Sequence, residues 1–206
     1  SNSWTNIWNE DIVNNGYTGF IWPKAADGSW VYDDELIPDP TKRHGSWVEF
    51  FYEASSWDYS FFVPHDIPQL IEKMGGEDTF CDRLKLGLDR NWVNIGNEPA
   101  FLSAYLFNYT NKPYLTTDYV GKLRNKFSIN GKPGNDDSGA MSSWYIFSSI
   151  GFFPNAGQNL YYFTSPHYEK TTITMDNGNQ FIIRANNLSE ENKYIQSITL
   201  NGKPYK

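Results

Sequence analysis

The sequence is poor in cysteine and in basic residues, and it has no long apolar run. Its single cysteine, Cys81, cannot form an internal disulfide, so the cysteine count indicates no redox compartment and we expect a buried thiol. Lys and Arg number 17 against 24 Asp and Glu, and this net charge of −7 argues against a nucleic-acid partner. Because no apolar run approaches the roughly 18 residues of a membrane span, no membrane partner is expected either.

Aromatic residues, in contrast, are abundant: 8 Trp, 14 Tyr and 14 Phe in 206 residues. Trp and Tyr combine an apolar face with a hydrogen-bonding edge, which suits them to line wet clefts and to stack on sugars. The alternative is that the rings fill a core poor in aliphatic residues. Composition alone supports both interpretations equally, and the first would favour a neutral polar ligand.

The pattern of apolar residues predicts helices in the first three quarters of the chain. After a possible first helix, the segment up to about residue 47 reads as long irregular loops with many turn residues. In the helix expected at 67–74, Pro68 lies in the first turn and Asp66 is the expected cap. Gly151 is expected to end the helix at 138–150. The expected helices cover residues 4–13, 67–74, 77–88, 99–107, 117–127 and 138–150. Thr116 or Thr117 is the expected cap of the helix at 117–127.

Beyond Pro154 the period changes from 3.6 to 2, which predicts strands at 160–164, 171–175, 180–185 and 194–200. Two Asn-Gly pairs, at 177–178 and 201–202, are strong hairpin signals. The expected fold class is therefore α+β, with a helical part at 1–154 and a C-terminal antiparallel β segment at 155–206. Because the chain ends just after a turn signal, we expect it to be cut from a larger protein.

A first polar cluster spans residues 53–66, where Glu53 is surrounded in sequence by aromatic residues. A carboxyl among rings is poorly solvated as an anion, so we expect Glu53 to hold a proton as a general acid must. The alternative is an ordinary surface or capping carboxylate, which on local pattern alone is the commoner case.

Two further clusters stand at loop-to-helix junctions. Asn97 and Glu98 precede Pro99, and they either cap a helix or offer hard oxygen ligands for Ca²⁺. Asp136 and Asp137 precede the helix predicted at 138–150, where one Asp would suffice as a cap. Glu53 lies in an apolar setting, and Asp136 and Asp137 lie in a polar one. This combination is typical of a glycosidase, in which one carboxyl donates a proton and another activates water.

Other polar residues carry weaker signals. The acidic run at 33–35 reads as solvated surface, and His44, His65 and His167 lack the spacing of a zinc site. The glycosylation sequons at Asn108 and Asn187 matter only in a eukaryotic secreted context.

Together these motifs resemble those of glycoside hydrolase family 92, a family of exo-acting α-mannosidases. The resemblance covers roughly residues 15–206 and rests on ordered motifs: Glu53-Ala-Ser-Ser-Trp-Asp-Tyr59, Val63-Pro-His-Asp66, Gly96-Asn-Glu-Pro99, Gly134-Asn-Asp-Asp-Ser-Gly-Ala-Met-Ser-Ser-Trp-Tyr145, Gly151-Phe-Phe-Pro154 and Ser165-Pro166. It implies that 1–154 is part of an (α/α)₆ barrel. It also implies partners outside this chain, namely an N-terminal β-sandwich domain and the rest of the barrel.

The resemblance implies an inverting, calcium-dependent mechanism on a mannose-containing glycan. Glu53 matches the general acid, and Asp136 and Asp137 lie in the motif that supplies the general base, without a choice between them. Asn97 and Glu98 match the motif near the calcium ion, which is thought to bind hydroxyls of the terminal mannose.

Trp57 and Tyr59 are assigned to the sugar pocket on the same basis, and His65 is a further candidate for substrate binding, with a structural hydrogen-bonding role as its alternative. Two departures from the usual pattern affect linkage preference and mannose recognition but keep the carboxylates: Ala100-Phe-Leu102 replaces Ser-His-His, and Ser55 and Asp58 replace Asn and Gln.

The sequence thus predicts the C-terminal catalytic segment of a secreted or periplasmic exo-α-mannosidase, acting on α-1,2-linked mannose and inactive as an isolated piece. The alternative is a non-catalytic carbohydrate-binding module whose carboxylates are structural.

Overall fold

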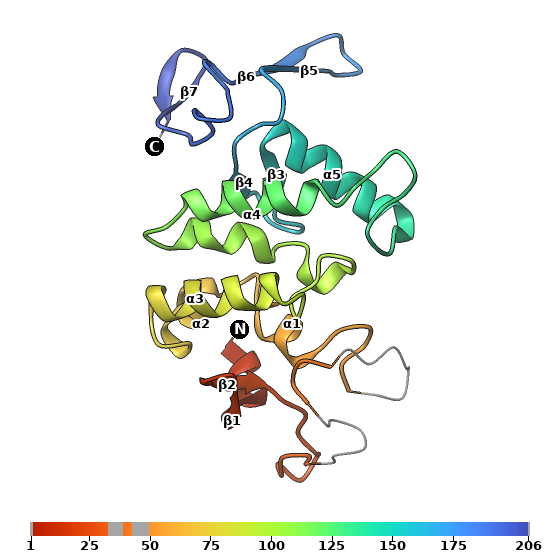
Figure 1. The fold of residues 1–206 in the computed structure, drawn as a ribbon, viewed down its shortest axis with the longest axis vertical. Helices are drawn as coiled ribbons and strands as arrows, with labels where there is room; N and C mark the ends of the chain where they lie inside the picture. Colours follow the sequence, from red (N-terminus) through yellow and green to blue (C-terminus); the bar gives the residue numbers. More distant parts are fainter. Residues whose placement is uncertain (1, 33–38, 43–49, 206) are drawn as a thin grey trace. The chain divides into compact units, whose positions relative to one another are not determined.

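The computed structural model describes residues 2–32, 39–42 and 50–205, and the chain divides into two compact units, Ser1–Asn111 and Lys112–Lys206 (Figure 1). The first unit contains η1 (Asn2–Ile7), β1 (Trp8–Asn14), β2 (Tyr17–Ile21), α1 (Ser56–Ser60), α2 (Ile67–Lys73), α3 (Glu77–Asp89), η2 (Glu98–Ala100) and η3 (Ser103–Tyr109). The second contains α4 (Tyr114–Arg124), η4 (Asp137–Gly139), α5 (Ala140–Ile150), β3 (Phe152–Pro154), β4 (Tyr161–Phe163), β5 (Lys170–Thr174), β6 (Gln180–Arg184), β7 (Ile198–Leu200) and β8 (Lys203–Tyr205). Here η denotes a 3₁₀ helix.

The N-terminal segment is a hairpin, so the helix predicted at 4–13 is wrong. A short 3₁₀ helix leads into β1, which pairs with β2 in antiparallel register. Trp4 and Trp8 are both buried, and they are four residues apart, which is also the spacing of residues on one face of a helix. The chain reverses at Asn15 and Gly16, both with left-handed φ angles of 50° and 82°, which is the geometry of a two-residue hairpin loop. The Asn15-Gly16 pair, within the segment predicted as long irregular loops, therefore forms the loop of a hairpin.

Helices α2 and α3 confirm the predictions for this part of the chain. The apolar residues predicted to face the core of α3 are buried, namely Phe80, Leu84 and Leu88. Pro68 lies in the first turn of α2, as expected, but the side chain of Asp66 makes no capping bond. It accepts a hydrogen bond from Trp4 Nε1 at 3.3 Å instead, which joins the start of α2 to the start of the chain.

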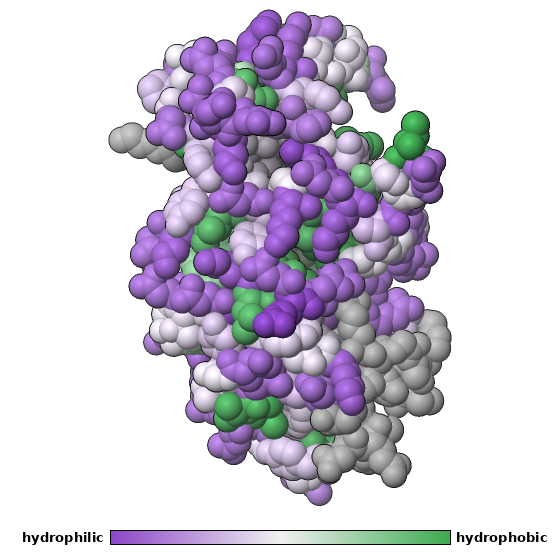
Figure 2. Space-filling model, viewed as in Figure 1, coloured by the Kyte–Doolittle hydropathy of each residue, from purple (hydrophilic) through white to green (hydrophobic). Residues whose placement is uncertain are grey.

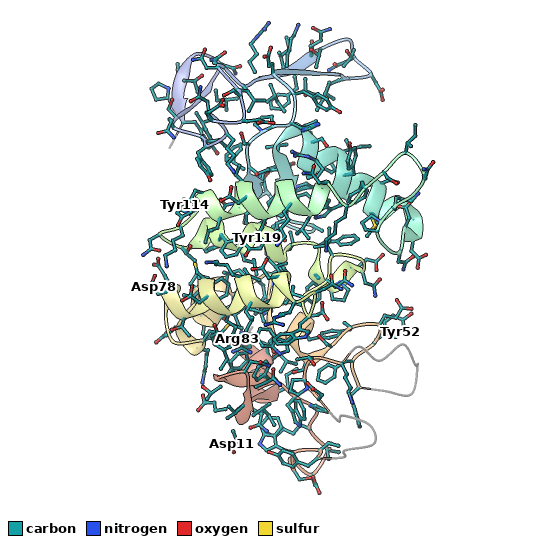
Figure 3. All side chains as sticks on the ribbon, viewed as in Figure 1. Asp11, Tyr52, Asp78, Arg83, Tyr114 and Tyr119 are labelled. Atoms are coloured by element: carbon teal, nitrogen blue, oxygen red, sulfur yellow. The ribbon has the colours of Figure 1, made fainter. Side chains whose placement is uncertain are left out.

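Arg83 on α3 lies in the interior of the first unit, between α3 and the β1–β2 hairpin (Figure 3). Its guanidinium donates to the backbone oxygens of Thr18 at 3.1 Å and Gly19 at 2.8 Å, and it lies 4.0 Å from the Phe20 ring centroid. Burial lowers the pKa of Arg83 to about 9. Many of the abundant rings, including Phe20 and Trp57 around this guanidinium, are thus core residues.

The segment predicted as one helix at 99–107 forms two 3₁₀ helices, η2 and η3. Its backbone bonds span three residues, as from Ala100 N to Asn97 O at 3.2 Å and from Tyr105 N to Leu102 O at 2.9 Å. All five residues at 103–107 are buried, so packing surrounds this segment rather than leaving one face to water. Tertiary packing therefore overrides the helical preference that the apolar pattern indicated.

In the second unit both predicted helices form with shifted starts. Helix α4 begins at Tyr114 with Pro113 as its N-cap, so the cap predicted at Thr116 or Thr117 is wrong, and Thr116 is buried inside the helix. Helix α5 follows the 3₁₀ turn η4 and ends, as predicted, at Gly151 with φ 81°. A Cβ at Gly151 would lie 2.7 Å from a backbone oxygen, so only glycine fits without a shift of the chain.

The strands of the second unit pair as three antiparallel hairpins, β3–β4, β5–β6 and β7–β8. Both predicted Asn-Gly turns confirm the hairpin signals, with Gly178 at φ 80° and Gly202 at φ 77°. The strand predicted at 194–200 is shorter than expected, because only its last three residues pair. The described chain is thus a mixed helix and strand fold with small antiparallel sheets, while the (α/α)₆ barrel and the boundary at 154 stay predictions.

A cleft of about 770 Å³ lies in the second unit, lined by residues from β3, β4, β6, β7 and β8 and from the connecting loops. On the face of the β5–β8 segment shown in Figure 2, apolar residues are scattered among hydrophilic ones. None of the predicted site residues lines this cleft. No helix within the described ranges is long and apolar enough to cross a membrane.

Candidate active site

Glu53 lies on a tight turn just before α1, and its backbone is left-handed with φ 48°. The turn is closed by a hydrogen bond from Ala54 N to Phe51 O at 3.3 Å. A non-glycine residue in this region costs about 1–3 kcal/mol and persists only where the surrounding structure holds it. The side chain is half-buried. Glu53 is therefore fixed by its context, as a residue with a defined task would be.

Asn97 meets Glu53 although 44 residues separate them. The Asn97 Nδ2 group donates to the Glu53 side-chain Oε2 at 3.0 Å and to the Glu53 backbone oxygen at 3.1 Å. The Asn97 side chain is only 6% exposed, so its amide orientation is set by these partners. The structure thus brings the first and second predicted clusters together in one place.

Glu98, the next residue, is exposed and starts η2. The Asn97 amide oxygen and the Glu98 carboxylate are hard oxygen donors of the kind that Ca²⁺ prefers. Over the described ranges, no three acidic, histidine or cysteine side chains gather where they would hold a metal ion. Asn97 and Glu98 are therefore at most part of a calcium site, to which other oxygen donors would have to contribute.

Asp58 on α1 was noted in the sequence only as a departure from a family pattern, yet it joins the same two loops. It is fully buried, and its Oδ2 accepts from Ser55 N at 2.8 Å and from Ser55 Oγ at 2.6 Å. Its other oxygen, Oδ1, accepts from Asn94 N at 2.9 Å. The Ser-x-x-Asp spacing is a capping-box pattern, and this signal would have identified the pair.

Of the residues assigned to a sugar pocket, Trp57 is fully buried in the core. Its ring centroid lies 5.5 Å from that of Phe20 and 5.1 Å from that of Trp92, and its Nε1 donates to Asn14 Oδ1 at 3.0 Å. A ring enclosed in this way presents no face to a ligand. This placement supports a packing role under α1 rather than sugar stacking.

Tyr59 and His65 are better placed for contact with a ligand. The Tyr59 hydroxyl donates to Tyr52 O at 3.1 Å, on the loop that carries Glu53 (Tyr52 is labelled in Figure 3). Burial, followed by the negative charges of Asp58 and Glu53, raises the pKa of Tyr59, which keeps it protonated. His65 is exposed in the turn before α2.

Asp136 and Asp137 differ sharply in their surroundings. Asp136 accepts from Ser142 N at 2.7 Å, from Ser142 Oγ at 3.0 Å and from Lys132 Nζ at 2.8 Å. The Lys132 hydrogen bond, followed by those of Ser142, lowers the pKa of Asp136 to about 2. Asp137 is exposed, and within the described ranges its carboxylate has no hydrogen-bond or ion-pair partner. Ser138, directly after it, is left-handed with φ 53°.

Glu53, Asn97 and Glu98 belong to the first unit and the two Asp residues to the second. Their gathering around one sugar-sized hollow therefore stays a prediction. The acidic run at 33–35 and His44 lie outside the described residues. Cys81 is a buried thiol, as expected, and its Sγ donates to Thr110 Oγ1 at 3.4 Å. His167 Nδ1 accepts a hydrogen bond from Arg124 Nη2 at 3.2 Å.

The comparisons with known proteins agree with the motifs. The family model of the glycosyl hydrolase family 92 catalytic domain matches residues 1–206. An uncharacterized secreted glycosidase of Arthroderma benhamiae is 37% identical over 221 residues, which cover all of this chain and 29% of that protein. The chain thus spans less than a third of the length of this curated relative.

Solved structures of the same family are similar to this chain. A family GH92 α-mannosidase of Bacteroides thetaiotaomicron, in complex with mannoimidazole, has a TM-score of 0.80 and 27% identity over 98% of this chain and 28% of its own. A family GH92 inverting mannosidase of the same bacterium has a TM-score of 0.80 and 27% identity over 99% of this chain and 30% of its own.

Proposed function

This chain belongs to glycosyl hydrolase family 92, and from that premise we propose that the protein carrying it is an exo-acting, inverting α-mannosidase that cleaves α-1,2-linked mannose. The similar solved structures are an α-mannosidase that binds mannoimidazole and an inverting mannosidase. The main support for the proposal is the hydrogen bond between Asn97 and Glu53. It brings the proposed acid next to a proposed calcium ligand, although 44 residues separate the two in the sequence.

In this mechanism Glu53 is the general acid that protonates the departing glycosidic oxygen. Its side chain is half-buried and oriented by the Asn97 amide, so the carboxyl is held in one place before the substrate arrives. Loss of such an acid typically costs about 10²–10⁴-fold in rate.

We assign the general base to Asp137 rather than Asp136. A base needs an accessible lone pair and enough basicity to take a proton from water. Asp136 has its oxygens engaged by Ser142 and Lys132, and with a pKa of about 2 it binds a proton weakly. Asp137 is exposed and has no such partners among the described residues. Asp136 would instead hold the start of α5 in place.

Asn97 and Glu98 would hold calcium, together with oxygen donors outside this pair. When bound, the ion supplies a hard positive charge for hydroxyls of the terminal mannose. The chain's own contribution is to present an amide oxygen on a buried side chain and a carboxylate on an exposed one, next to the acid. Tyr59 and His65 would contact the sugar, and Trp57 would hold α1 beneath them.

The complete protein is proposed to act outside the cell or in the periplasm on a mannose-containing glycan. The support is the Arthroderma benhamiae relative, which is described as secreted. The isolated 206-residue piece is expected to be inactive, because it spans less than a third of its relatives' length.

The test is Glu53→Gln in the complete protein, assayed on an α-1,2-linked mannobiose with calcium present. We expect turnover to fall by about 10²–10⁴-fold while the thermal unfolding midpoint stays near that of the natural protein. Near-normal turnover would remove Glu53 from the acid role. Binding of the glycan without turnover, unchanged after joint replacement of Glu53, Asp136 and Asp137, would favour a non-catalytic carbohydrate-binding module instead.

A further inference from the structure

Asp58 is a buried carboxylate next to the proposed acid, and the mechanism above does not use it. It lies in α1, five residues after Glu53, and is completely enclosed. Burying a carboxylate is costly unless hydrogen bonds compensate the lost hydration. Its oxygens are occupied on both sides, and the partners come from two different loops.

The first partner is Ser55, which is two residues from Glu53. Asp58 Oδ2 accepts from both the Ser55 backbone N–H at 2.8 Å and the Ser55 hydroxyl at 2.6 Å. These bonds fix the backbone directly after the left-handed turn at Glu53. The direction in which the Glu53 side chain leaves the backbone depends on this turn.

The second partner is the loop that leads to Asn97. Asp58 Oδ1 accepts from Asn94 N at 2.9 Å, and Asn94 Oδ1 in turn accepts from Gly96 N at 2.7 Å. Ser55 Oγ adds a contact to Trp92 O at 3.0 Å. The Asp58 carboxylate therefore connects the loop that carries Glu53 to the loop that carries Asn97.

We propose that Asp58 is a positioning residue for glycoside hydrolysis, which holds Glu53 and Asn97 in register by bridging Ser55 and Asn94 with its two oxygens. The inference rests on the proposed function. It assigns Asp58 no contact with the substrate.

The chemistry of the bridge requires a carboxylate. All three described donors, two from Ser55 and one from Asn94, point at Asp58, and a carboxylate can accept on both of its oxygens. An asparagine has one acceptor oxygen and one NH₂ group, so in either orientation its NH₂ faces an N–H or O–H donor. Asp58→Asn is therefore expected to break the hydrogen bonds to either Ser55 or Asn94, while the side chain keeps its size and shape.

A capping residue that only stabilises α1 would lower stability without altering the chemistry. The two roles separate when the leaving group is varied. A dinitrophenyl leaving group departs without protonation, whereas an alkyl leaving group needs the general acid. A misplaced acid therefore slows hydrolysis of an alkyl α-mannoside far more than that of a dinitrophenyl α-mannoside.

The experiment measures kcat and KM for methyl α-mannoside and dinitrophenyl α-mannoside in the complete protein with calcium. We expect Asp58→Asn to lower kcat for the methyl substrate at least about tenfold more than for the dinitrophenyl substrate, with smaller changes in KM. The matched control is Leu70→Ala, a fully buried apolar side chain on α2 that makes no hydrogen bond to either loop. It is expected to lower the unfolding midpoint but to affect both substrates equally.

If Asp58→Asn does not fold, Ser55→Ala replaces it in the same assay, because it removes the hydroxyl and keeps the backbone N–H. Equal losses on the two substrates, as in the Leu70 control, or no loss at all, would overturn the inference. Glu53→Gln distinguishes the possible failures. If the natural protein hydrolyses neither mannoside, the proposed function fails. If Glu53→Gln shows the leaving-group dependence and the Asp58 variant does not, only the positioning role fails.

Discussion

Asn97→Asp is a nearly isosteric change that converts the contact with Glu53 from attraction to repulsion. In the natural protein the Asn97 Nδ2 group donates to Glu53 Oε2 at 3.0 Å. In the variant an oxygen takes the place of that nitrogen. Two unit charges 3.0 Å apart repel by about 1.4 kcal/mol in bulk water and by about 5.5 kcal/mol at an effective dielectric constant of about 20.

The true cost lies between these limits, because Glu53 is half-buried and Asn97 is only 6% exposed. We expect a loss of about 2–4 kcal/mol in the free energy of unfolding at pH 7.5. Protonation of either carboxyl removes the repulsion between them, so the loss should become smaller as the pH falls. The destabilisation therefore grows as the pH rises.

Calorimetric unfolding of the complete protein, without calcium, at several pH values between 4 and 7.5 measures this difference. Asn187→Asp is the matched control, since Asn187 is exposed in the second unit and the change there should shift the midpoint little at any pH. A midpoint difference for Asn97→Asp that does not vary with pH would refute the reasoning. It would mean that the two carboxyls do not repel each other in the folded protein, either because they are not in contact or because Glu53 keeps its proton, as a general acid does.

Three further predictions follow from the second unit. Asp137→Asn should lower turnover by about 10²–10⁴-fold and Asp136→Asn by much less, which steady-state rates on a mannoside would show, and the reverse order would move the base to Asp136. The Lys132 hydrogen bond holds the pKa of folded Asp136 at about 2, below the ordinary value of an aspartate, so Asp136 adds stability at neutral pH that is lost as the pH falls towards 2. Lys132→Met should therefore reduce acid resistance in a pH-dependent unfolding scan. Gly151→Ala should lower the midpoint more than Gly157→Ala, since both have φ near 80° but only Gly151 is crowded by backbone, and equal shifts would show that crowding is relieved cheaply.

The elements that sequence predicted correctly are those in which local pattern and packing agree. Helix α3 has a single apolar stripe and clear ends, and its bounds at Glu77 and Asp89 match the prediction within a residue. The β5–β6 hairpin likewise follows from alternation around an Asn-Gly turn. The prediction of a helix at 4–13 failed because Trp4 on η1 and Trp8 on β1 are both buried at a spacing that a helix would also produce.

For the candidate site, the sequence singled out residues but not the contacts between them. It gave Glu53 and Asn97 as separate clusters, and no local rule predicts that an amide 44 residues away orients the acid. The family resemblance assigned Trp57 to the sugar pocket, whereas packing against Arg83 and Phe20 encloses that ring. Long-range packing, which composition does not encode, decided both cases.

The unusual backbone at the site explains why the polar contacts are needed. Glu53 adopts φ 48° and Ser138, beside the two Asp residues, adopts φ 53°. Both conformations cost free energy that local propensity does not repay, so they persist only through interactions made elsewhere. At Glu53 these interactions are the Asn97 amide and the Asp58 bridge, and at Ser138 they include the bonds that hold Asp136 to α5. The turn that carries the proposed acid is thus held by the side chains of Asn97 and Asp58, and replacing those residues should disturb the chemistry before it unfolds the chain.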